Sequence, residues 1–182
     1  MSKITLVTGG SRSGKSTFAE NLLKDKDNVL YIATSIITDK EMEDRVNRHK
    51  ESRNSLWTTY EGYENLDKAI ENSNKKYILL DCITIMTTNL LFKTERDFEN
   101  FSKEDMDDVL SYIKKQFTKL IEKARDMDIE LVMVTNEVGW GIVPEYKISR
   151  IFRDIAGFVN QYVASISDDV YLVACGLPLK LK

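Results

Sequence analysis

Short apolar runs alternate along this chain with segments whose apolar residues recur at helical spacing. The runs are rich in β-branched residues and suit buried strands; they cover residues 4–8, 29–33, 77–80, 129–135 and 170–174. The helical segments are 16–23, 39–53, 64–72, 106–126 and 147–166. Strands that alternate with helices predict an α/β fold, in which helices cover both faces of a mainly parallel sheet.

The remaining chain and its composition add limits to this picture. Residues 93–105 are rich in charge and poor in apolar side chains, which predicts a surface connection. The length of 182 residues suits one domain, residues 1–182, with a substantial core. Hydrophobic residues make up 42% and charged residues 30%, which excludes a disordered chain.

Charge, apolar runs and cysteines indicate the compartment and the partners. The net charge is −3 and no long basic stretch occurs, so we expect no nucleic-acid partner. No apolar run approaches a membrane span, and the N-terminus enters the first predicted strand directly, which leaves no room for a signal peptide. Cys82 and Cys175 lie far apart, each beside an apolar run, and both are interpreted as reduced core residues. A cytoplasmic protein fits these features.

A phosphate-binding loop lies between the first predicted strand and the first predicted helix. The pattern is a glycine, any four residues, glycine, lysine, and serine or threonine; it is formed by Gly9, Gly10, Ser11, Arg12, Ser13, Gly14, Lys15 and Ser16. Backbone N–H groups of such a loop cradle phosphate oxygens, Lys15 can reach the outer phosphates, and the Ser16 hydroxyl can ligate Mg²⁺. The alternative is a glycine turn without a ligand, which the strand and helix on either side make less favourable.

Polar residues follow three other strands at the edge where the phosphates should lie. Asp81 follows the run 77–80 and is predicted to be the second Mg²⁺ anchor, with a helix cap as the alternative. Thr34 and Ser35 follow the run 29–33 and should face the nucleotide, unless they only cap a turn. The loop 135–144, with two glycines and a proline, suggests a wall of the active site, a connector or a subunit contact.

The only histidine, His49, lies among cations. Arg45, Arg48, Lys50 and Arg53 surround it in sequence. Positive neighbours disfavour protonation of an imidazole and leave its nitrogen available as a nucleophile, while the same cations could hold a polyphosphate. A structural histidine on an ordinary solvated helix face remains the alternative.

These segments together resemble the bifunctional adenosylcobinamide kinase/adenosylcobinamide-phosphate guanylyltransferase family of cobalamin biosynthesis. The resemblance runs nearly end to end, and its most specific motifs are the runs 135–144 and 152–157. Other matching segments are 8–16, 31–35, 45–53, 57–61, 87–92 and 159–161. The resemblance implies a P-loop NTPase-like, three-layer α/β/α fold and a homotrimer.

The resemblance also implies two reactions. First, the γ-phosphoryl group of GTP or ATP passes to the aminopropanol hydroxyl of adenosylcobinamide, with Lys15 as a catalytic residue and Mg²⁺ held by Ser16 and Asp81. Second, His49 attacks the α-phosphorus of GTP, and the guanylyl group passes to adenosylcobinamide phosphate, giving adenosylcobinamide-GDP. The implied nucleotide-binding residues are those of the phosphate loop together with Thr34, Ser35, Ile36, Lys50, Glu51, Ser52, Arg53, Glu61 and Asp81.

Two other functions are kept as hypotheses. One is a different small-molecule P-loop kinase, in which His49 only contacts phosphate and no covalent guanylyl intermediate forms. The other is a regulator that binds nucleotide without turnover; the chain lacks the guanine-reading and switch motifs of regulatory GTPases, which argues against it. Asp81 also stands where relatives carry glutamate, which shortens the reach of that carboxylate.

Overall fold

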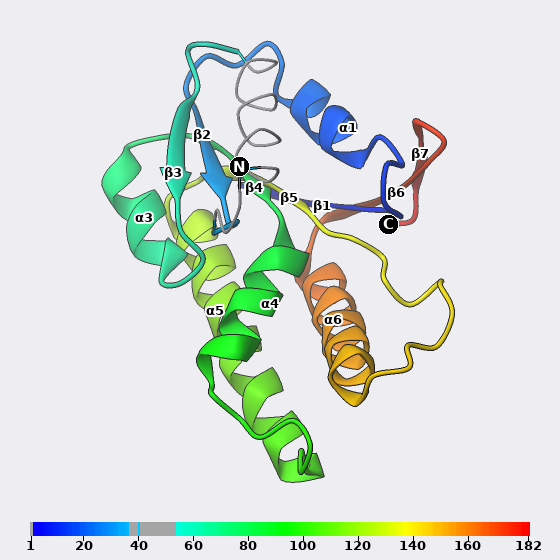
Figure 1. Cartoon of the computed structure of the whole chain (residues 1–182). Helices are drawn as coiled ribbons and strands as arrows, with labels where there is room; N and C mark the ends of the chain where they lie inside the picture. The colour runs from blue at the N-terminus through cyan, green and yellow to red at the C-terminus, as the bar shows by residue number, and fades with distance from the viewer. Residues whose placement is uncertain (1, 37–39, 41–53) are drawn as a thin grey trace.

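The computed structural model describes residues 2–36, 40 and 54–182. Helices and strands alternate along the chain (Figure 1). In chain order they are β1 (Lys3–Thr8), α1 (Lys15–Leu22), β2 (Val29–Ala33), β3 (Thr58–Glu61), α3 (Leu66–Ser73), β4 (Tyr77–Asp81), α4 (Ile83–Lys93), α5 (Lys103–Asp126), β5 (Glu130–Val134), α6 (Lys147–Ile166), β6 (Asp169–Ala174) and β7 (Leu177–Lys180).

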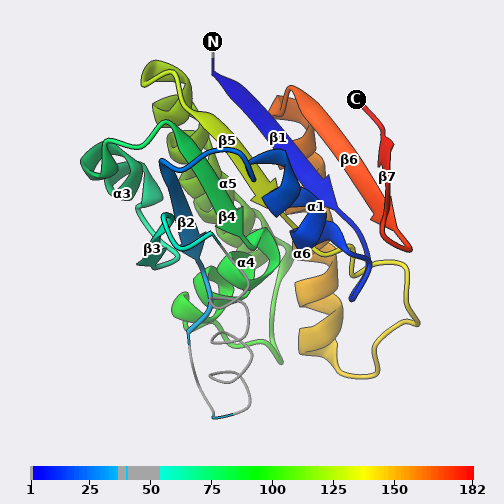
Figure 2. The same ribbon diagram turned by 90° about the horizontal axis from the view of Figure 1, so that it is seen from above.

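One seven-stranded sheet organises these elements in the order β3-β2-β4-β5-β1-β6-β7. Every described strand pairing is parallel except that of β7 with β6. Strand β5 lies between β1 and β4, because Met133 pairs with Leu6 on one side and with Leu80 on the other. The carboxyl ends of these strands therefore meet at one edge of the sheet (Figure 2).

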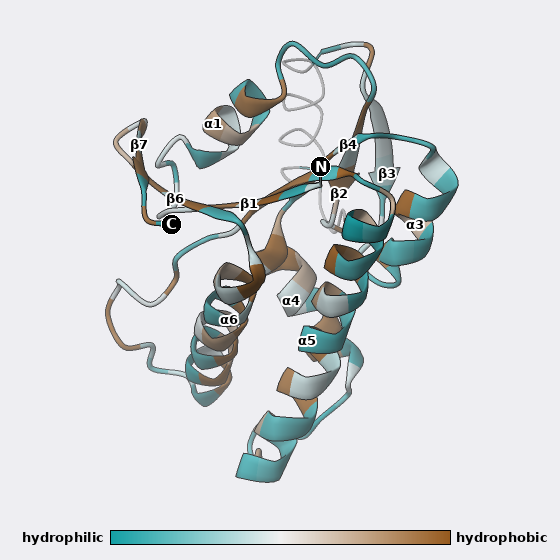
Figure 3. Cartoon of the chain, turned by 180° about the vertical axis from the view of Figure 1, so that it is seen from behind, coloured by the Kyte–Doolittle hydropathy of each residue, from teal (hydrophilic) through white to brown (hydrophobic). Residues whose placement is uncertain are grey.

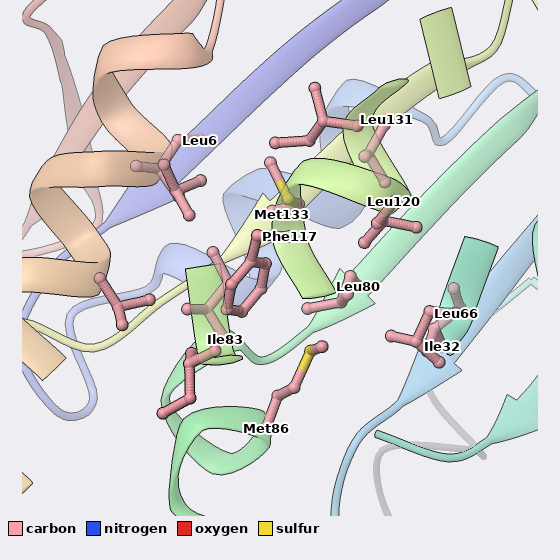
Figure 4. Packing of buried hydrophobic residues seen from close by; sticks show 14 of the residues in the cluster. Leu6, Ile32, Leu66, Leu80, Ile83, Met86, Phe117, Leu120, Leu131 and Met133 are labelled. Atoms are coloured by element: carbon pink, nitrogen blue, oxygen red, sulfur yellow. The ribbon is translucent and has the colours of Figure 1, made fainter. Parts of the chain in front are cut away.

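Helices cover both faces of the sheet, in three layers. Alternate residues of the strands point to opposite faces. Strand residues on one face, such as Val7, pack against α1. Strand residues on the other face, such as Leu6, pack against α3, α4, α5 and α6. Phe117 of α5 lies at the centre of the larger cluster (Figure 4) and is fully buried, which contributes about 2 kcal/mol of stabilisation. Helix α5 combines this apolar stripe with a hydrophilic outer face (Figure 3).

The predicted α/β architecture is confirmed, with small shifts at the ends of elements. The strand predicted at 29–33 matches β2, and the helix predicted at 147–166 matches α6. Helix α5 begins three residues earlier than its apolar pattern indicates, because Ser102 and Asp105 form a capping box at its N-terminus. Except for residue 40, the helix predicted at 39–53 lies outside the described residues. No described helix is both long and apolar enough to cross a membrane.

The structure corrects several expectations. Strands β3 and β7 were not predicted, because each is short and exposed and carries no apolar run. Helix α4 was not predicted either: its threonines and isoleucines favour strands intrinsically, and burial against α5 and α6 overrides that preference. The connection between α4 and α5 is not purely a surface segment, since Phe98 and Phe101 pack against the core.

One of the two cysteines is also misplaced by the sequence pattern. Both are free thiols, and Cys82 is buried as expected. Cys175 is exposed, because β6 ends at Ala174 and the chain turns there into β7. Its φ of 52° belongs to this turn rather than to the strand. The expectation that Cys175 is a core residue is therefore wrong.

Candidate functional site

The phosphate loop joins β1 to the N-terminus of α1. Gly14 precedes the helix with a φ of 92°, a conformation that favours glycine. A Cβ atom on Gly9 would lie 2.4 Å from the Val173 carbonyl oxygen and 2.6 Å from Ser13 Oγ, so only glycine fits there. Lys15 Nζ donates to the Gly10 carbonyl at 2.9 Å, which keeps the ammonium group over the loop. The positive end of α1 adds to an anion-binding field.

Two distant segments hold this loop through its backbone. The Gly176 N–H, in the turn between β6 and β7, donates to the Ser13 carbonyl at 2.8 Å. The Glu137 N–H, after β5, donates to the Gly9 carbonyl at 3.0 Å. Ser13 Oγ is buried without a hydrogen-bond partner among the described residues. An orphaned hydroxyl inside a glycine loop is a donor that a bound phosphate could satisfy.

Asp81 lies at the end of β4, where the sequence predicts it. The Tyr31 hydroxyl donates to Asp81 Oδ2 at 2.9 Å and orients the carboxylate. The next peptide bond, from Asp81 to Cys82, is cis. Burial, with a smaller effect of the Asp81 charge, raises the pKa of the Cys82 thiol to about 11. Cys82 is therefore protonated at neutral pH and is not a nucleophile.

Thr34 has a positioning role in this geometry. Its hydroxyl accepts from the Cys82 N–H at 2.9 Å and donates to the Cys82 carbonyl at 2.8 Å. The Thr34 N–H donates to the Asp81 carbonyl, and the Thr34 carbonyl accepts from Asn89 Nδ2. The side chain is fully buried. Thr34 thus fixes the backbone around Asp81, and direct contact of Thr34 with a nucleotide stays a prediction.

The register of the sheet places the other predicted residues at the same edge. Ala33 at the end of β2 pairs with Glu61 on one side and with Asp81 on the other. Asp81 in turn pairs with Val134, and Val134 with Val7, just before the phosphate loop. Ser35 and the half-exposed Ile36 follow β2 at this edge. His49, Lys50, Glu51, Ser52 and Arg53 lie outside the described residues.

A ring of hydrogen bonds at this edge has no counterpart in the sequence predictions. The Asn136 N–H donates to Thr84 Oγ1 at 2.7 Å, and Thr84 Oγ1 lies 3.2 Å from Thr135 Oγ1. Thr135 donates to Asn160 Oδ1 at 2.7 Å, and Asn160 Nδ2 donates to the Asn136 carbonyl at 3.1 Å. The ring joins α4, the segment directly after β5, and α6. No local motif signals it, because its members are far apart in the chain.

This chain is similar in sequence to known proteins over nearly its whole length. Residues 5–181 match the family model described as cobinamide kinase/cobinamide phosphate guanyltransferase. The chain belongs to this family. It is 44% identical to the bifunctional adenosylcobalamin biosynthesis protein CobU of Escherichia coli, over 97% of this chain and 98% of that protein. The CobU protein of Salmonella typhimurium is 46% identical over the same shares, and the CobP protein of Pseudomonas aeruginosa 32% over 97% and 96%.

Membership of the cobinamide kinase/guanyltransferase family makes this chain a transferase and confirms the predicted family. The matched region includes every segment of the site described above, from the phosphate loop to the turn before β7. A family described by a kinase and a guanyltransferase reaction needs a site that can hold phosphate groups. The edge formed by the phosphate loop, Asp81 and β5 is the part of the described structure that suits this task.

Proposed function

We propose that residues 1–182 form one P-loop catalytic domain that phosphorylates adenosylcobinamide and then transfers a guanylyl group to the product. The observation that carries this proposal is the geometry at one edge of the sheet. The phosphate loop ends β1 and Asp81 ends β4, with only β5 between them. Family membership favours this function over an unrelated small-molecule kinase.

We assign the described residues the following roles in the kinase reaction. Phosphoryl transfer depends on positioning and charge neutralisation more than on covalent chemistry. The loop N–H groups and Lys15 would hold the outer phosphates of GTP or ATP. The acceptor hydroxyl of adenosylcobinamide forms a new bond to the γ-phosphorus, while the bond to the leaving nucleoside diphosphate breaks.

The donor set at this edge fits a Mg²⁺ ion. Ser16 and Asp81 offer hard oxygen atoms, which Mg²⁺ prefers, and phosphate oxygens and water commonly complete its coordination. Ser16 and Asp81 would share the ion with the nucleotide. When bound, the ion would neutralise charge that develops on the phosphates. Tyr31 would keep Asp81 oriented for this contact.

The guanylyl transfer is assigned to His49 by family resemblance. The imidazole nitrogen forms a bond to the α-phosphorus of GTP, and pyrophosphate leaves. A phosphate oxygen of adenosylcobinamide phosphate then attacks the same phosphorus, and the bond to nitrogen breaks. A covalent intermediate divides one difficult displacement into two easier steps. Lys50, Glu51, Ser52 and Arg53 are proposed to bind nucleotide on the same grounds, and Ser35, Ile36 and Glu61 because they lie at the site edge.

Other properties are proposed from the same resemblance. We expect a homotrimer with a corrinoid as its small-molecule partner. A cytoplasmic location is compatible with the two free cysteines.

Incubation with GTP labelled at the α-phosphate tests the proposal. Wild-type protein should acquire label that is stable to base and labile to acid, and unlabelled adenosylcobinamide phosphate should remove it. His49→Ala should acquire none, and Lys15→Ala should lose the label and the kinase activity. Lys24→Ala is the matched control, because Lys24 is exposed and lies just after α1. Equal labelling of His49→Ala would reject the assigned nucleophile, and kinase activity without any label would favour the single-reaction alternative.

A further inference from the structure

We propose that the side-chain amide of Asn136 contacts the γ-phosphoryl group during the kinase reaction. The sequence predicts only that the loop 135–144 could be a wall of the active site, and neither it nor the family description gives Asn136 itself a role. The inference rests on the kinase half of the proposed function, and it names one more residue that touches the transferred group. It follows from the position of β5, from the contacts of Asn136 and from the ring that holds its backbone.

The position of Asn136 is set by the order of the strands. Because β5 lies between β1 and β4, its carboxyl end opens between the loop that follows β1 and the end of β4 (Figure 2). Asp81 is the last residue of β4. The next residue, Glu137, donates its N–H to Gly9 of the loop at 3.0 Å. On the other side, Asn136 Nδ2 lies 3.9 Å from Cys82 Sγ, immediately after Asp81. Asn136 therefore bridges the two structures expected to bind the triphosphate and its metal ion.

The hydrogen-bond ring fixes the backbone of Asn136 and leaves the amide group for another partner. Thr135 has one hydroxyl proton, and it goes to Asn160 Oδ1, so Thr84 must donate to Thr135. Thr84 Oγ1 can then accept from the Asn136 N–H, and Asn160 Nδ2 donates to the Asn136 carbonyl. Thr135 is fully buried and Thr84 is 8% exposed, so the two hydroxyls of the ring are shielded from water, while Asn136 and Asn160 are partly exposed. The only described contact of the Asn136 amide is with sulfur, which is a weak acceptor.

An amide donor at this position suits the reaction. During transfer, negative charge spreads over the three outer oxygens of the γ-phosphoryl group. The acceptor hydroxyl forms the new P–O bond, the bridging oxygen leaves with the electron pair of the broken bond, and the hydroxyl proton passes to water. Asn136 Nδ2 can donate to a γ-oxygen throughout this step without adding charge. Thr84 and Asn160 are positioning residues, because they act through Asn136.

The first test compares two nucleotides that differ in the γ-phosphate. For Asn136→Ala, affinity for the non-hydrolysable GTP analogue guanylyl imidodiphosphate should fall about 10-fold, whereas affinity for GDP should change less than about twofold. Isothermal titration calorimetry with Mg²⁺ measures both. Asn100→Ala removes an amide from an exposed loop and is the matched control. An equal loss of affinity for the analogue and for GDP, or no loss of affinity for either, would overturn the proposal.

A second variant and a kinetic measurement complete the test. Asn136→Asp keeps the size of the side chain but places a carboxylate against the γ-phosphate, so its loss of analogue affinity should exceed that of Asn136→Ala. For Asn136→Ala, kcat of the kinase reaction should fall about 10-fold or more, while label transfer from saturating GTP to His49 should stay within about threefold. A proportional loss in both reactions would contradict the proposal. The affinity comparison tests the contact between Asn136 and the γ-phosphate even if wild-type protein fails to phosphorylate adenosylcobinamide. A failure of the proposed function can therefore be distinguished from a failure of this inference.

Discussion

The two sides of the candidate site are held in place by different chemistry. On one side, the phosphate loop is fixed by backbone groups: Gly176 and Glu137 donate N–H groups to its carbonyls, and Gly9 leaves room for Val173. On the other side, Asp81 is fixed by side chains: the hydroxyl groups of Tyr31 and Thr34 hold its carboxylate and the following peptide. Glycine geometry therefore governs the first side and buried hydroxyls the second.

This difference predicts which substitutions each side tolerates. A backbone hydrogen bond survives most side-chain changes, so the loop side should respond mainly to added volume. A buried hydroxyl is lost when the side chain loses its oxygen, so the Asp81 side should respond to isosteric changes that preserve volume. Variants that add a methyl group and variants that remove a hydroxyl group can separate the two.

The largest effect is expected for Gly9→Ala. The new Cβ would lie 2.4 Å from the Val173 carbonyl and 2.6 Å from Ser13 Oγ, and the Val173 backbone cannot move without disturbing β6. We expect the free energy of unfolding to fall by about 2–3 kcal/mol and nucleotide affinity to fall about 10-fold or more. Urea unfolding and calorimetry measure these. Gly10→Ala is the stability control, because its Cβ would meet no atom within 4 Å. Equal destabilisation by both variants would show that the close contacts at Gly9 are not the cause.

Thr34→Val should have the next largest effect. It keeps the shape of the side chain but leaves the buried Cys82 N–H without its partner, and the Cys82 carbonyl keeps only the bond from the Met86 N–H. The cost should be about 2 kcal/mol in the free energy of unfolding. Kinase activity should fall as well, because Thr34 positions Asp81. Thr59→Val, on exposed strand β3, provides the matched change and should leave stability within about 0.5 kcal/mol. Unchanged stability in Thr34→Val would show that the hydrogen bonds between the Thr34 hydroxyl and the Cys82 backbone do not stabilise the fold.

The contrast between the two sides also explains what the sequence could predict. The phosphate loop was predicted residue by residue, because its glycines, lysine and serine are contiguous. Asp81 was predicted because it directly follows an apolar strand. The ring through Thr84, Thr135 and Asn160 could not be found this way: its members come from α4, from the segment directly after β5 and from α6, and only the folded sheet brings them together.

Local patterns failed for the fold where tertiary contacts override propensity. The buried strands were predicted because each fills a continuous apolar run. Helix α4 was missed because β-branched Thr84 and Thr87 are poor helix formers, and burial stabilises them there. Cys175 was placed in the core because an apolar run precedes it, but the turn that brings Gly176 to the phosphate loop begins at that residue.

Tyr31→Phe should have a smaller effect than either change above. It removes the hydroxyl that donates to Asp81 Oδ2 at 2.9 Å and leaves the ring in place in the smaller apolar cluster, which also contains Ala19 of α1. We expect a loss of about 1 kcal/mol in the free energy of unfolding. The kinase reaction should need more Mg²⁺ for half-maximal rate, because the carboxylate is less well oriented. Tyr146→Phe, whose side chain is exposed, is the control. An unchanged Mg²⁺ dependence would indicate that Tyr31 does not orient Asp81 for the metal ion.

The smallest effect on nucleotide binding is expected at the opposite edge of the sheet, where Asp169 forms ion pairs with Lys180 at 2.8 Å and Lys3 at 2.7 Å. Hydrogen bonds from these lysines, Lys180 first, lower the pKa of Asp169 below its ordinary value of 3.8. A lowered pKa stabilises the fold above that value, and the stabilisation disappears as the pH falls through the folded-state pKa. Asp169→Asn should therefore cost about 1 kcal/mol at pH 7 and progressively less below pH 3.8, without changing nucleotide affinity. Urea unfolding across this range measures the difference, with exposed Asp154→Asn as the control. A pH-independent cost would show that the charge of Asp169 is not what stabilises this edge.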